Sequence, residues 1–591
     1  MVQPVLAEVA QRAREQGVSA DALMIAEGFI TESAFYQKLA DHLGASVARG
    51  DEPLAADLDW RNALASGMAQ LADGGFLLAP RAQAIAVLLQ NVSPHAQGKH
   101  LVIAPPTRFG SMVRAACAGE MAAAAADELA QKHPDLSARS GIHARQKYAL
   151  GGVGALIALG LVDGGAVWMM ACALFGLAML VGVVLRLACT LLGTLSFLSA
   201  SRVLTDAQLP TYSVLVALYR EAAIVPQLVA ALRALDYPAA KCEIVFLVEV
   251  DDEETQAALA VQDMPPNFTI ITVPEGFPRT KPRALNFGLL AACGECLVIF
   301  DAEDKPEPDQ LRKAAARFAD GSARLACLQA ALCIENYRDS WLTRLFALDY
   351  AAQFDVFLRG LAVLGLPAPL GGTSNHFRTR ILREIGGWDA WNVTEDADLG
   401  LRLARAGYHT GALESVTWEE APPTLRDWLP QRRRWMKGWM QTFVTHTRRP
   451  IKLWRDLGLA HGVHVLALLA SNTLGPLVGV WCTVFVLYAG IAGDLLAAQD
   501  SLLHEIANAC WLGLASLGLL SIVLPTLVAM QRRKLWSCAI FLVLRPLHWL
   551  LMSAACLAAL VELNRNPFHW AKTRHGLAHG GLSTDRDPDP P

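Results

Sequence analysis

The most constraining feature of the sequence is a short apolar run that ends abruptly in acids. Residues 297–300 read Leu-Val-Ile-Phe, and Asp301, Glu303 and Asp304 follow directly. Such a run predicts a buried strand of an α/β sheet, whose ligands bind beyond the carboxyl ends of the strands. Clustered carboxylates repel one another, so they favour a hard divalent cation such as Mg²⁺ or Mn²⁺. An acidic turn that binds nothing is the competing interpretation.

Length and hydropathy indicate several domains, some of them associated with a membrane. The chain has 591 residues, more than one hydrophobic core usually supports, and its mean hydropathy is +0.31. The formal net charge of −4 gives no reason to expect a nucleic-acid partner. The 12 cysteines are scattered, many of them in apolar segments, so we expect reduced thiols rather than a disulfide framework.

Long apolar segments divide the chain into parts. They predict an N-terminal domain at 1–145, two transmembrane helices within 146–200, a soluble block at 201–450, a C-terminal transmembrane bundle at 451–563 and a tail at 564–591. Lys and Arg flank the first helix pair on its outer sides and recur in the tail. The positive-inside rule therefore puts the soluble block and both termini in the cytoplasm, which favours an even number of C-terminal crossings.

The soluble block predicts a parallel, doubly wound sheet. Apolar, β-forming runs at 212–219, 243–250 and 268–273 precede the run at 297–300, and a helical pattern lies between the first two. Asp251 and Asp252 follow the second run. They are expected at the same edge as the later acids, where they could hydrogen-bond a nucleoside base or ribose.

Two further positions carry side chains that could bind a diphosphate or accept a proton. Lys281 precedes a predicted helix, where a fixed cation can hold a diphosphate. Glu395 and Asp396 open the predicted helix 397–406, and a carboxylate at a helix start can act as a general base toward a hydroxyl nucleophile.

A further cluster of polar residues is Gln431-Arg432-Arg433-Arg434-Trp435. In the functional interpretation Gln431 and Arg434 neutralise a leaving diphosphate, and the Trp435 indole stacks on a sugar ring. The alternative is an amphipathic interfacial helix whose cations face lipid headgroups.

Taken in order, these motifs resemble the processive family 2 glycosyltransferases, such as the cellulose, curdlan and hyaluronan synthases. The resemblance covers roughly residues 200–562, with Asp-Asp, a DxD-like acid group, Thr-Glu-Asp and Gln-x-x-Arg-Trp between membrane segments. Residues 300–308 and 566–576 are similar to the curdlan and related bacterial β-glucan synthase branch.

The resemblance implies a fold and residue roles. The fold would be a GT-A-type, Rossmann-like α/β domain embedded between transmembrane helices. Asp252, with Asp251, would contact uridine; Lys281 would touch the diphosphate; Asp301 and Glu303 would hold the metal. The family has Asp where Glu303 stands, so Asp304 would share that role. Asp396, beside Glu395, would be the base. The roles at the acceptor and diphosphate fall to Thr373, Asn375, Gln431, Arg434 and Trp435.

The implied activity is inverting polymerisation of a β-linked polysaccharide from UDP-glucose, with export of the growing chain through a bacterial inner membrane. Its partners would be the nucleotide sugar, the growing polysaccharide chain and membrane lipids. Two alternatives stay open. One is transfer of a single sugar to a lipid carrier. The other is a non-catalytic inner-membrane component of receptor or assembly type, because the domain pairing resembles proteins described as phage-adsorption components.

Residues 1–145 predict a small, mostly helical cytoplasmic domain. The run 28–33, with Leu39 and Leu43, resembles the N-terminal domain of type II secretion ATPases, and Thr31 is a candidate helix cap. Relatives of that domain bind cyclic diguanylate in some proteins. A second messenger or a protein partner is therefore expected here, with a plain helical adaptor as the alternative.

Overall fold

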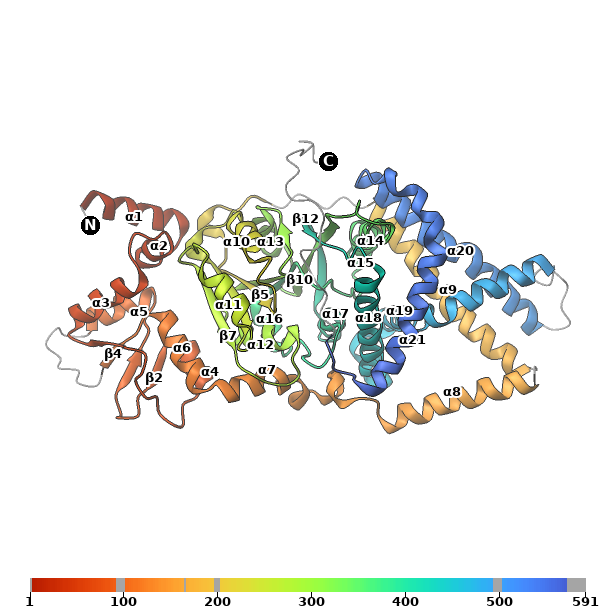
Figure 1. Ribbon diagram of the computed structural model, residues 1–591, viewed down its shortest axis with the longest axis horizontal. Helices are drawn as coiled ribbons and strands as arrows, with labels where there is room; N and C mark the ends of the chain where they lie inside the picture. The colour runs from red at the N-terminus through yellow and green to blue at the C-terminus, as the bar shows by residue number, and fades with distance from the viewer. Residues whose placement is uncertain (1–2, 92–100, 164–165, 196–201, 493–501, 571–591) are drawn as a thin grey trace.

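The computed structural model describes residues 3–91, 101–163, 166–195, 202–492 and 502–570. The N-terminal region, a central sheet covered by helices and a group of long helices follow one another along the longest axis of the molecule (Figure 1). The candidate site lies where the sheet meets the long helices.

Half of the central sheet is parallel, as the sequence predicts. Strands β5 (Tyr212–Leu218), β6 (Cys242–Glu249), β7 (Phe268–Val273) and β8 (Cys296–Phe300) lie in the order β7-β6-β5-β8. Side chains of β8 alternate between two cores: Leu297 and Ile299 enter one, Val298 and Phe300 the other. This burial on both faces explains why the run has no polar residue before Asp301.

The other half of the sheet is mixed, which corrects the prediction of a purely parallel sheet. Strand β11 (Asn375–Arg378) runs antiparallel to β8, and β10 (Leu325–Ile334) runs antiparallel to β11. Strand β12 (His409–Glu419) is parallel to β10, and the short β9 (Lys305–Pro306) closes the edge. The carboxyl end of β12 therefore joins that of β8 at one side of the sheet.

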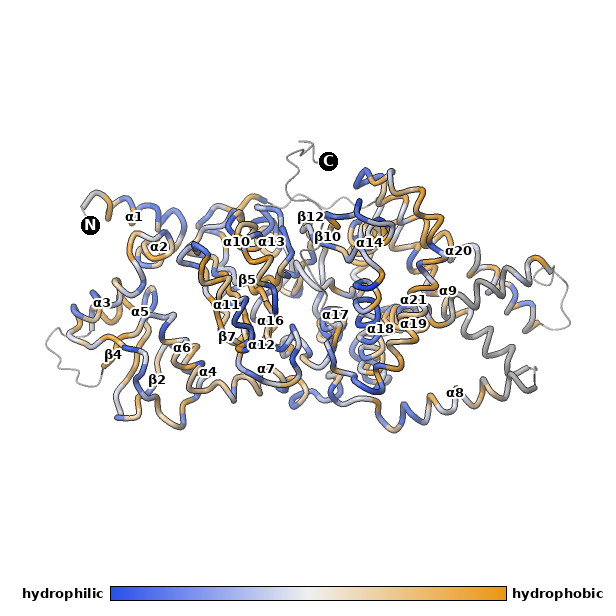
Figure 2. Tube along the Cα trace, in the orientation of Figure 1, coloured by the Kyte–Doolittle hydropathy of each residue, from blue (hydrophilic) through white to orange (hydrophobic). Residues whose placement is uncertain are grey.

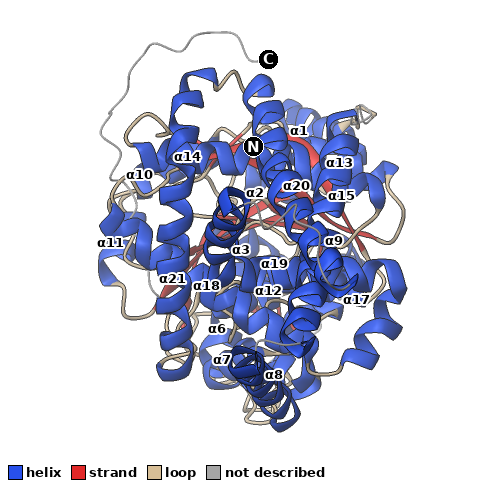
Figure 3. Ribbon diagram, turned by 90° about the vertical axis from the view of Figure 1, so that its right-hand side faces the viewer, coloured by secondary structure: helices blue, strands red, loops and turns tan. Residues whose placement is uncertain are grey.

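Helices flank the sheet and carry several of the predicted motifs. They are α10 (Val225–Arg233), α11 (Glu253–Ala260), α12 (Lys281–Ala291), α13 (Gln310–Asp320), α16 (Thr379–Glu384) and α17 (Glu395–Arg405). A second group covers the carboxyl side: α14 (Trp341–Ala351), the π-helical η5 (Ala352–Phe357), α15 (Leu358–Leu364) and α18 (Leu425–Thr447). Seen from the helical end, this second group lies in front of the strands (Figure 3).

The long apolar helices gather beyond α18. They are α8 (Ala144–Asp163), α9 (Ala166–Leu195), α19 (Pro450–Ala492), α20 (Leu502–Arg532), the 3-10 helix η6 (Trp536–Leu544) and α21 (Arg545–Arg565). Hydrophobic residues dominate much of α20 and α21 (Figure 2). Within the described residues, three helical stretches are long and apolar enough to cross a membrane: Pro450–Leu477, Asn508–Arg532 and Trp536–Arg565. Residues 164–165, within the stretch predicted to form two transmembrane helices, and most of the predicted tail lie outside the described residues.

The N-terminal region contains a sheet as well as helices. Its helices are α1 (Gln3–Gln16), α2 (Ala20–Ala26), α3 (Glu32–Leu43), α4 (Trp60–Ser66), α5 (Gln83–Asn91), α6 (Pro106–Ala116) and α7 (Ala118–Lys132). Thr31 caps α3 by accepting the Ala34 N–H at 3.2 Å, as predicted. The sheet, in the order β1-β4-β3-β2, was not predicted; its strands are Ser46–Val47, Leu101–Ile103, Phe76–Leu78 and Met68–Gln70.

The end of the N-terminal region packs on the loop that precedes α17. The carboxylate of Asp389 accepts hydrogen bonds from the Ser137 hydroxyl at 2.9 Å and from the Ala138 N–H at 2.6 Å. The buried Arg448 guanidinium donates to the Ser137 carbonyl at 2.7 Å and to the Gly141 carbonyl at 2.9 Å. The N-terminal region therefore supports the segment that leads to Glu395 and Asp396.

Candidate active site

The acids after β8 meet a lysine from the start of α12. The Lys281 ammonium forms an ion pair with Asp301 and donates to the Gly372 carbonyl at 2.7 Å. Asp301 is 29% exposed and Lys281 only 14% exposed at the side chain. The predicted diphosphate-binding cation and the first predicted metal ligand therefore lie in direct contact.

Asp304 lies beneath Asp301 and is almost completely buried. Its Oδ2 accepts the Asp301 N–H at 2.7 Å and the Thr373 hydroxyl, whereas its Oδ1 has no hydrogen-bond partner among the described residues. Burial, and then the charges of Asp301 and Glu303, raise the pKa of Asp304 well above its ordinary value. A cation bound among these acids would therefore favour the charged form of Asp304.

Glu419 is a fourth carboxylate at this edge, and no local sequence pattern distinguishes it. It ends β12 and lines the same cavity. Burial raises its pKa well above the ordinary value, followed by the charges of Asp304, Glu303 and Asp301. The antiparallel pairing of β12 with β9, in which Trp418 lies opposite Lys305, brings this residue, far along the chain, to the acids that follow β8.

Glu395 and Asp396 form the first turn of α17 and are close to both cations of the site. Burial raises the pKa of Glu395 to about 8, with a further contribution from Asp396, while Lys281 and Arg434 lower it. Burial also raises the pKa of Asp396. Glu395 is 3% exposed, whereas Asp396 is half-buried, so Asp396 is the more accessible of the two.

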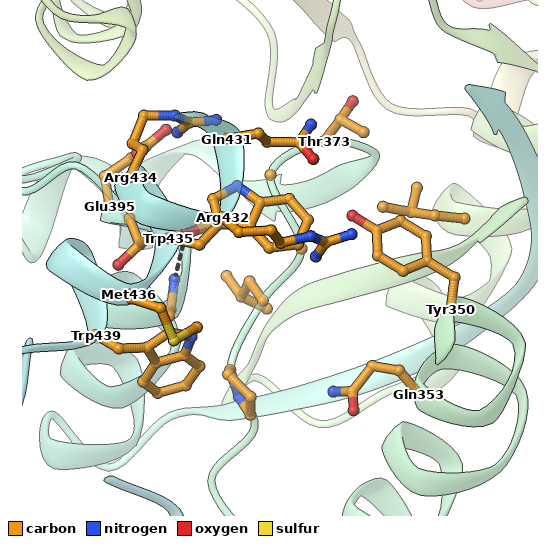
Figure 4. A pocket seen from close by; sticks show the side chains of 18 of the residues that line it. Tyr350, Gln353, Thr373, Glu395, Gln431, Arg432, Arg434, Trp435, Met436 and Trp439 are labelled. Atoms are coloured by element: carbon orange, nitrogen blue, oxygen red, sulfur yellow. Dashed lines mark hydrogen bonds between the residues drawn. The ribbon is translucent and has the colours of Figure 1, made fainter. Parts of the chain in front are cut away.

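The Gln-x-x-Arg-Trp motif lies on α18, where Gly438 allows the helix to approach Thr394 closely. The Arg434 guanidinium donates to the Val393 carbonyl at 3.2 Å and lies 4.4 Å from the ring centre of Trp570. Trp435 stacks on Tyr350 with ring centroids 6.5 Å apart. Gln431 points toward Thr373, and Arg432 lies between Trp435 and Tyr350 (Figure 4).

One cavity of about 840 Å³ joins most of the predicted site residues. Its lining includes Lys281, Asp301, Glu303, Thr373, Glu395, Asp396, Gln431, Arg434 and Trp435. The cavity continues between the long helices, where Arg186 of α9, Asn472 of α19 and Thr526 of α20 line it. Trp570, which was not predicted, lines it from the segment that follows α21.

The remaining predicted residues lie beside the cavity rather than in its lining. Asp252 is buried and caps α11, and its carboxylate accepts the backbone N–H groups of Arg220 and Thr255. Asp251 is half-exposed and pairs with Arg279 at 2.7 Å. The Asn375 amide donates to the Gly371 carbonyl at 2.7 Å and thereby holds the loop before β11.

The acids supply only some of the oxygen atoms that a divalent metal ion needs, and a bound phosphate would have to supply the rest. Among the residues that the structure describes, no three His, Cys, Asp or Glu side chains are grouped closely enough to hold an ion by themselves. However, the donors are hard oxygens and one buried oxygen of Asp304 is unpartnered. This arrangement suits Mg²⁺ or Mn²⁺ bound by one or two carboxylates together with substrate phosphates.

The mixed sheet, the acids at its carboxyl edge and the cationic helix opposite them define a GT-A-like glycosyltransferase fold. Residues 296–563 match the family described as glycosyl transferase family group 2. Residues 296–563 therefore resemble a family 2 glycosyltransferase domain.

Curated relatives match about two fifths of the chain. A Bacillus subtilis protein named "Probable glycosyltransferase YdaM" is 26% identical over 234 residues, which is 39% of this chain and 56% of that protein. The beta-monoglucosyldiacylglycerol synthase of Synechocystis sp. is 29% identical over 244 residues, 40% of this chain and 50% of the relative. The chain thus spans about half the length of the curated relatives it matches.

Among solved structures, the mannosyltransferase PcManGT from Pyrobaculum calidifontis, in complex with GDP-Man and Mn²⁺, is similar at 20% identity with a TM-score of 0.41. The similarity covers 67% of this chain and 98% of that structure.

Proposed function

We propose that the chain is an inverting, processive glycosyltransferase that extends a β-linked polysaccharide from a cytoplasmic nucleotide sugar, UDP-glucose. The observation that carries the proposal is the single cavity shared by the acids of the sheet and the long apolar helices. A donor site that opens directly into a membrane bundle suits a product that leaves through the bundle.

The donor diphosphate would lie between Lys281 and Arg434. Both cations line the same cavity and both lower the pKa of Glu395, so a ligand bound there could face both. Asp251 is the better placed of the two nucleoside-binding candidates, because the Asp252 carboxylate is engaged by backbone N–H groups. The ion pair between Lys281 and Asp301 would open when the diphosphate binds.

Asp301 and Glu303 would hold Mg²⁺ or Mn²⁺, with Asp304 behind them. The bound ion would neutralise charge that develops on the leaving diphosphate. Lys281 and Arg434 would stabilise the same charge from the protein side.

The acceptor hydroxyl would give its proton to Asp396 as its oxygen bonds to the anomeric carbon. The bond from that carbon to the diphosphate oxygen breaks in the same step, so one displacement inverts the anomer and gives a β-linkage. Asp396 is the proposed base because it is more exposed to the cavity than Glu395. Burial raises the pKa of Asp396, which makes it a stronger base than an ordinary aspartate.

The acceptor sugar would be held between α18 and the loop before β11. Trp435 offers an aromatic face for a sugar ring, and Gln431 with Thr373 offers polar groups on the opposite side (Figure 4). Asn375 would act indirectly, through its hydrogen bond to Gly371.

A second candidate is transfer of one sugar to a lipid acceptor. The name of the Synechocystis relative, a beta-monoglucosyldiacylglycerol synthase, favours it. The same cavity between apolar helices would then admit a lipid rather than release a polymer.

The remaining proposals concern location and regulation. We infer a bacterial inner-membrane protein with a cytoplasmic catalytic domain and cytoplasmic termini. The N-terminal domain would bind cyclic diguanylate or a protein partner. Its hydrogen bonds around Asp389 support a route from that domain to α17.

The experiment is to incubate the purified chain with individually labelled nucleotide sugars and Mg²⁺ or Mn²⁺, and to digest the products with linkage-specific hydrolases. The proposal expects long, β-linked polymer from UDP-glucose. Labelled glycolipid without polymer would favour the second candidate, and no sugar transfer from any donor would contradict both.

A further inference from the structure

A buried group of basic side chains lies beside the acceptor end of the cavity and takes no part in the proposed transfer. It consists of Arg432 and Trp428 on α18, and Arg545 and His548 on α21. Each of these four residues is at least nine-tenths buried. Asp349 on α14 contributes one carboxylate, which pairs with Arg545.

Several hydrogen-bond donors of this group have no partner among the described residues. They are Nε and Nη2 of Arg432, Nε and Nη2 of Arg545, and Nε1 of Trp428; Nδ1 of His548 is unpartnered as well. Leaving buried polar groups unpaired is costly, so such a concentration of donors indicates a ligand rather than chance.

The packing of Arg432 explains why its donors stay free. Its guanidinium lies 4.1 Å from the ring centres of both Phe346 and Trp435, and 5.4 Å from that of Trp428. Aromatic faces stabilise a guanidinium above and below its plane, whereas its N–H groups point outward within the plane. The stacking therefore holds the cation rigidly and leaves its donors available.

The charges of the group are unbalanced. Arg186 of α9 lines the same cavity and interacts with both Asp349 and Arg545. Three guanidinium groups thus lie near Asp349, and Glu419 is a further carboxylate whose charge acts on Arg432. Burial lowers the pKa of Arg432 to about 10, which still leaves it charged at neutral pH.

We propose that Arg432, Arg545, Trp428 and His548 form an oxyanion site that binds a phosphate group. A phosphate offers several acceptor oxygens and negative charge, and guanidinium groups bind it through paired N–H bonds. The cavity reaches Arg432 and Asp349, and Arg545 pairs with Asp349, so a ligand can approach these two arginines from the cavity.

The phosphate can come from a lipid headgroup or from free phosphate. Arg545 begins α21 inside the candidate membrane stretch Trp536–Arg565, and basic pockets between membrane helices bind lipid headgroups. This binding goes beyond the proposed sugar transfer and can be measured without a nucleotide sugar, so failure of one proposal leaves the other intact.

The test is calorimetric titration of the purified full chain in an uncharged detergent. The probes are dihexanoyl phosphatidic acid, dihexanoylglycerol, which has the same chains and no phosphate, and inorganic phosphate. The proposal expects binding of phosphatidic acid and none of dihexanoylglycerol. Equal binding of both lipids, or no binding of either lipid or of inorganic phosphate, would overturn it.

Variants then assign the binding to these residues. Arg432→Gln and Arg545→Gln should each weaken it roughly tenfold or more. Arg344→Gln is the matched control, because Arg344 also stacks on a ring, that of Phe541, but lies outside the group. Asp349→Asn should tighten binding by releasing Arg545, a result that misfolding could not produce.

Inorganic phosphate separates the two sources. Binding of inorganic phosphate with the same dependence on the variants supports a site for free phosphate, and binding of the lipid alone supports a headgroup site. Wild-type affinity in both arginine variants would overturn the assignment.

Discussion

The ammonium group of Lys281 forms an ion pair with Asp301 and at the same time donates to the Gly372 carbonyl at 2.7 Å. One lysine thus joins the start of α12, the end of β8 and the loop before β11. The charge of the same ammonium group lowers the pKa of Glu395 at the start of α17. Its position makes it the link between the donor side and the base side of the cavity.

Lys281→Gln should impair donor binding more than folding. Loss of the cation removes a charge-assisted contact to the diphosphate and leaves the acids unbalanced, so we expect the KM for the nucleotide sugar to rise roughly tenfold or more. Initial rates at varied donor concentration measure this. Lys313→Gln is the control, because Lys313 pairs with Glu307 and Asp309 outside the cavity. An unchanged KM in Lys281→Gln would contradict the assignment.

Metal binding should depend on the acids after β8. With a nucleoside diphosphate present, Mn²⁺ should raise the Tm of the wild-type chain, since a ligand that binds only the folded state stabilises it. Asp301→Asn should abolish most of this shift. Asp320→Asn, at a surface pair with Arg202, should retain it. A full Mn²⁺ shift in Asp301→Asn would remove Asp301 from the metal site.

Stability should fall as the pH rises through the range in which Glu395 titrates. The folded-state pKa of Glu395 is about 8 against an ordinary value of 4.5, so the folded chain holds a proton that the unfolded chain has released. Its contribution to the free energy of unfolding is complete below pH 4.5 and is lost up to about pH 8. Tm should therefore decrease less from pH 5 to pH 8 in Glu395→Gln than in the wild type.

The same Tm measurement can also contradict the assignment for Glu395. If Glu395→Gln and the wild type lose the same Tm over that range, Glu395 keeps an ordinary pKa. The burial of Glu395 at the start of α17 would then not raise its pKa as the structure implies.

Much of the sheet could be predicted because its strands carry a strong local signal. The run from Leu297 to Phe300 is apolar throughout because β8 is buried on both faces, and Asp301 marks its end. The mixed half could not be predicted, since the pairing of β11 with β8 and of β12 with β10 depends on contacts far apart in the sequence. The N-terminal strands have two or three residues each, too few to show alternation.

In the candidate site, too, residues with a local sequence signal could be predicted and residues placed by distant contacts could not. Asp301, Glu303 and Asp396 stand at the ends of recognisable elements, and the structure brings them to one cavity. Glu419 reaches that cavity only through strand pairing, so nothing local distinguishes it from other acids. Asp252 has a clear motif, yet in the structure its carboxylate caps a helix.

The contact between the N-terminal region and the catalytic domain should depend strongly on Arg448. This buried guanidinium donates to the carbonyls of Pro134, Ser137 and Gly141. Arg448→Ala should cost about 2–3 kcal/mol in the free energy of unfolding, because buried acceptors lose their donor. Limited proteolysis should also cut faster near these carbonyls.

Arg449→Ala is the matched neighbour. Arg449 is 62% exposed and pairs with Asp135 at 2.9 Å, so its loss should cost no more than about 1 kcal/mol. Equal effects of the two variants would show that Arg448 has no special role in this contact.

The most direct test of the account is the rate of sugar transfer by Asp396→Asn with saturating nucleotide sugar and metal. The substitution keeps the size of the side chain and removes its ability to accept a proton. The account predicts a decrease in kcat of about 10²- to 10⁴-fold with donor binding retained. Polymer or glycolipid formed at close to the wild-type rate would contradict the assignment of Asp396 as base, and with it the proposed mechanism.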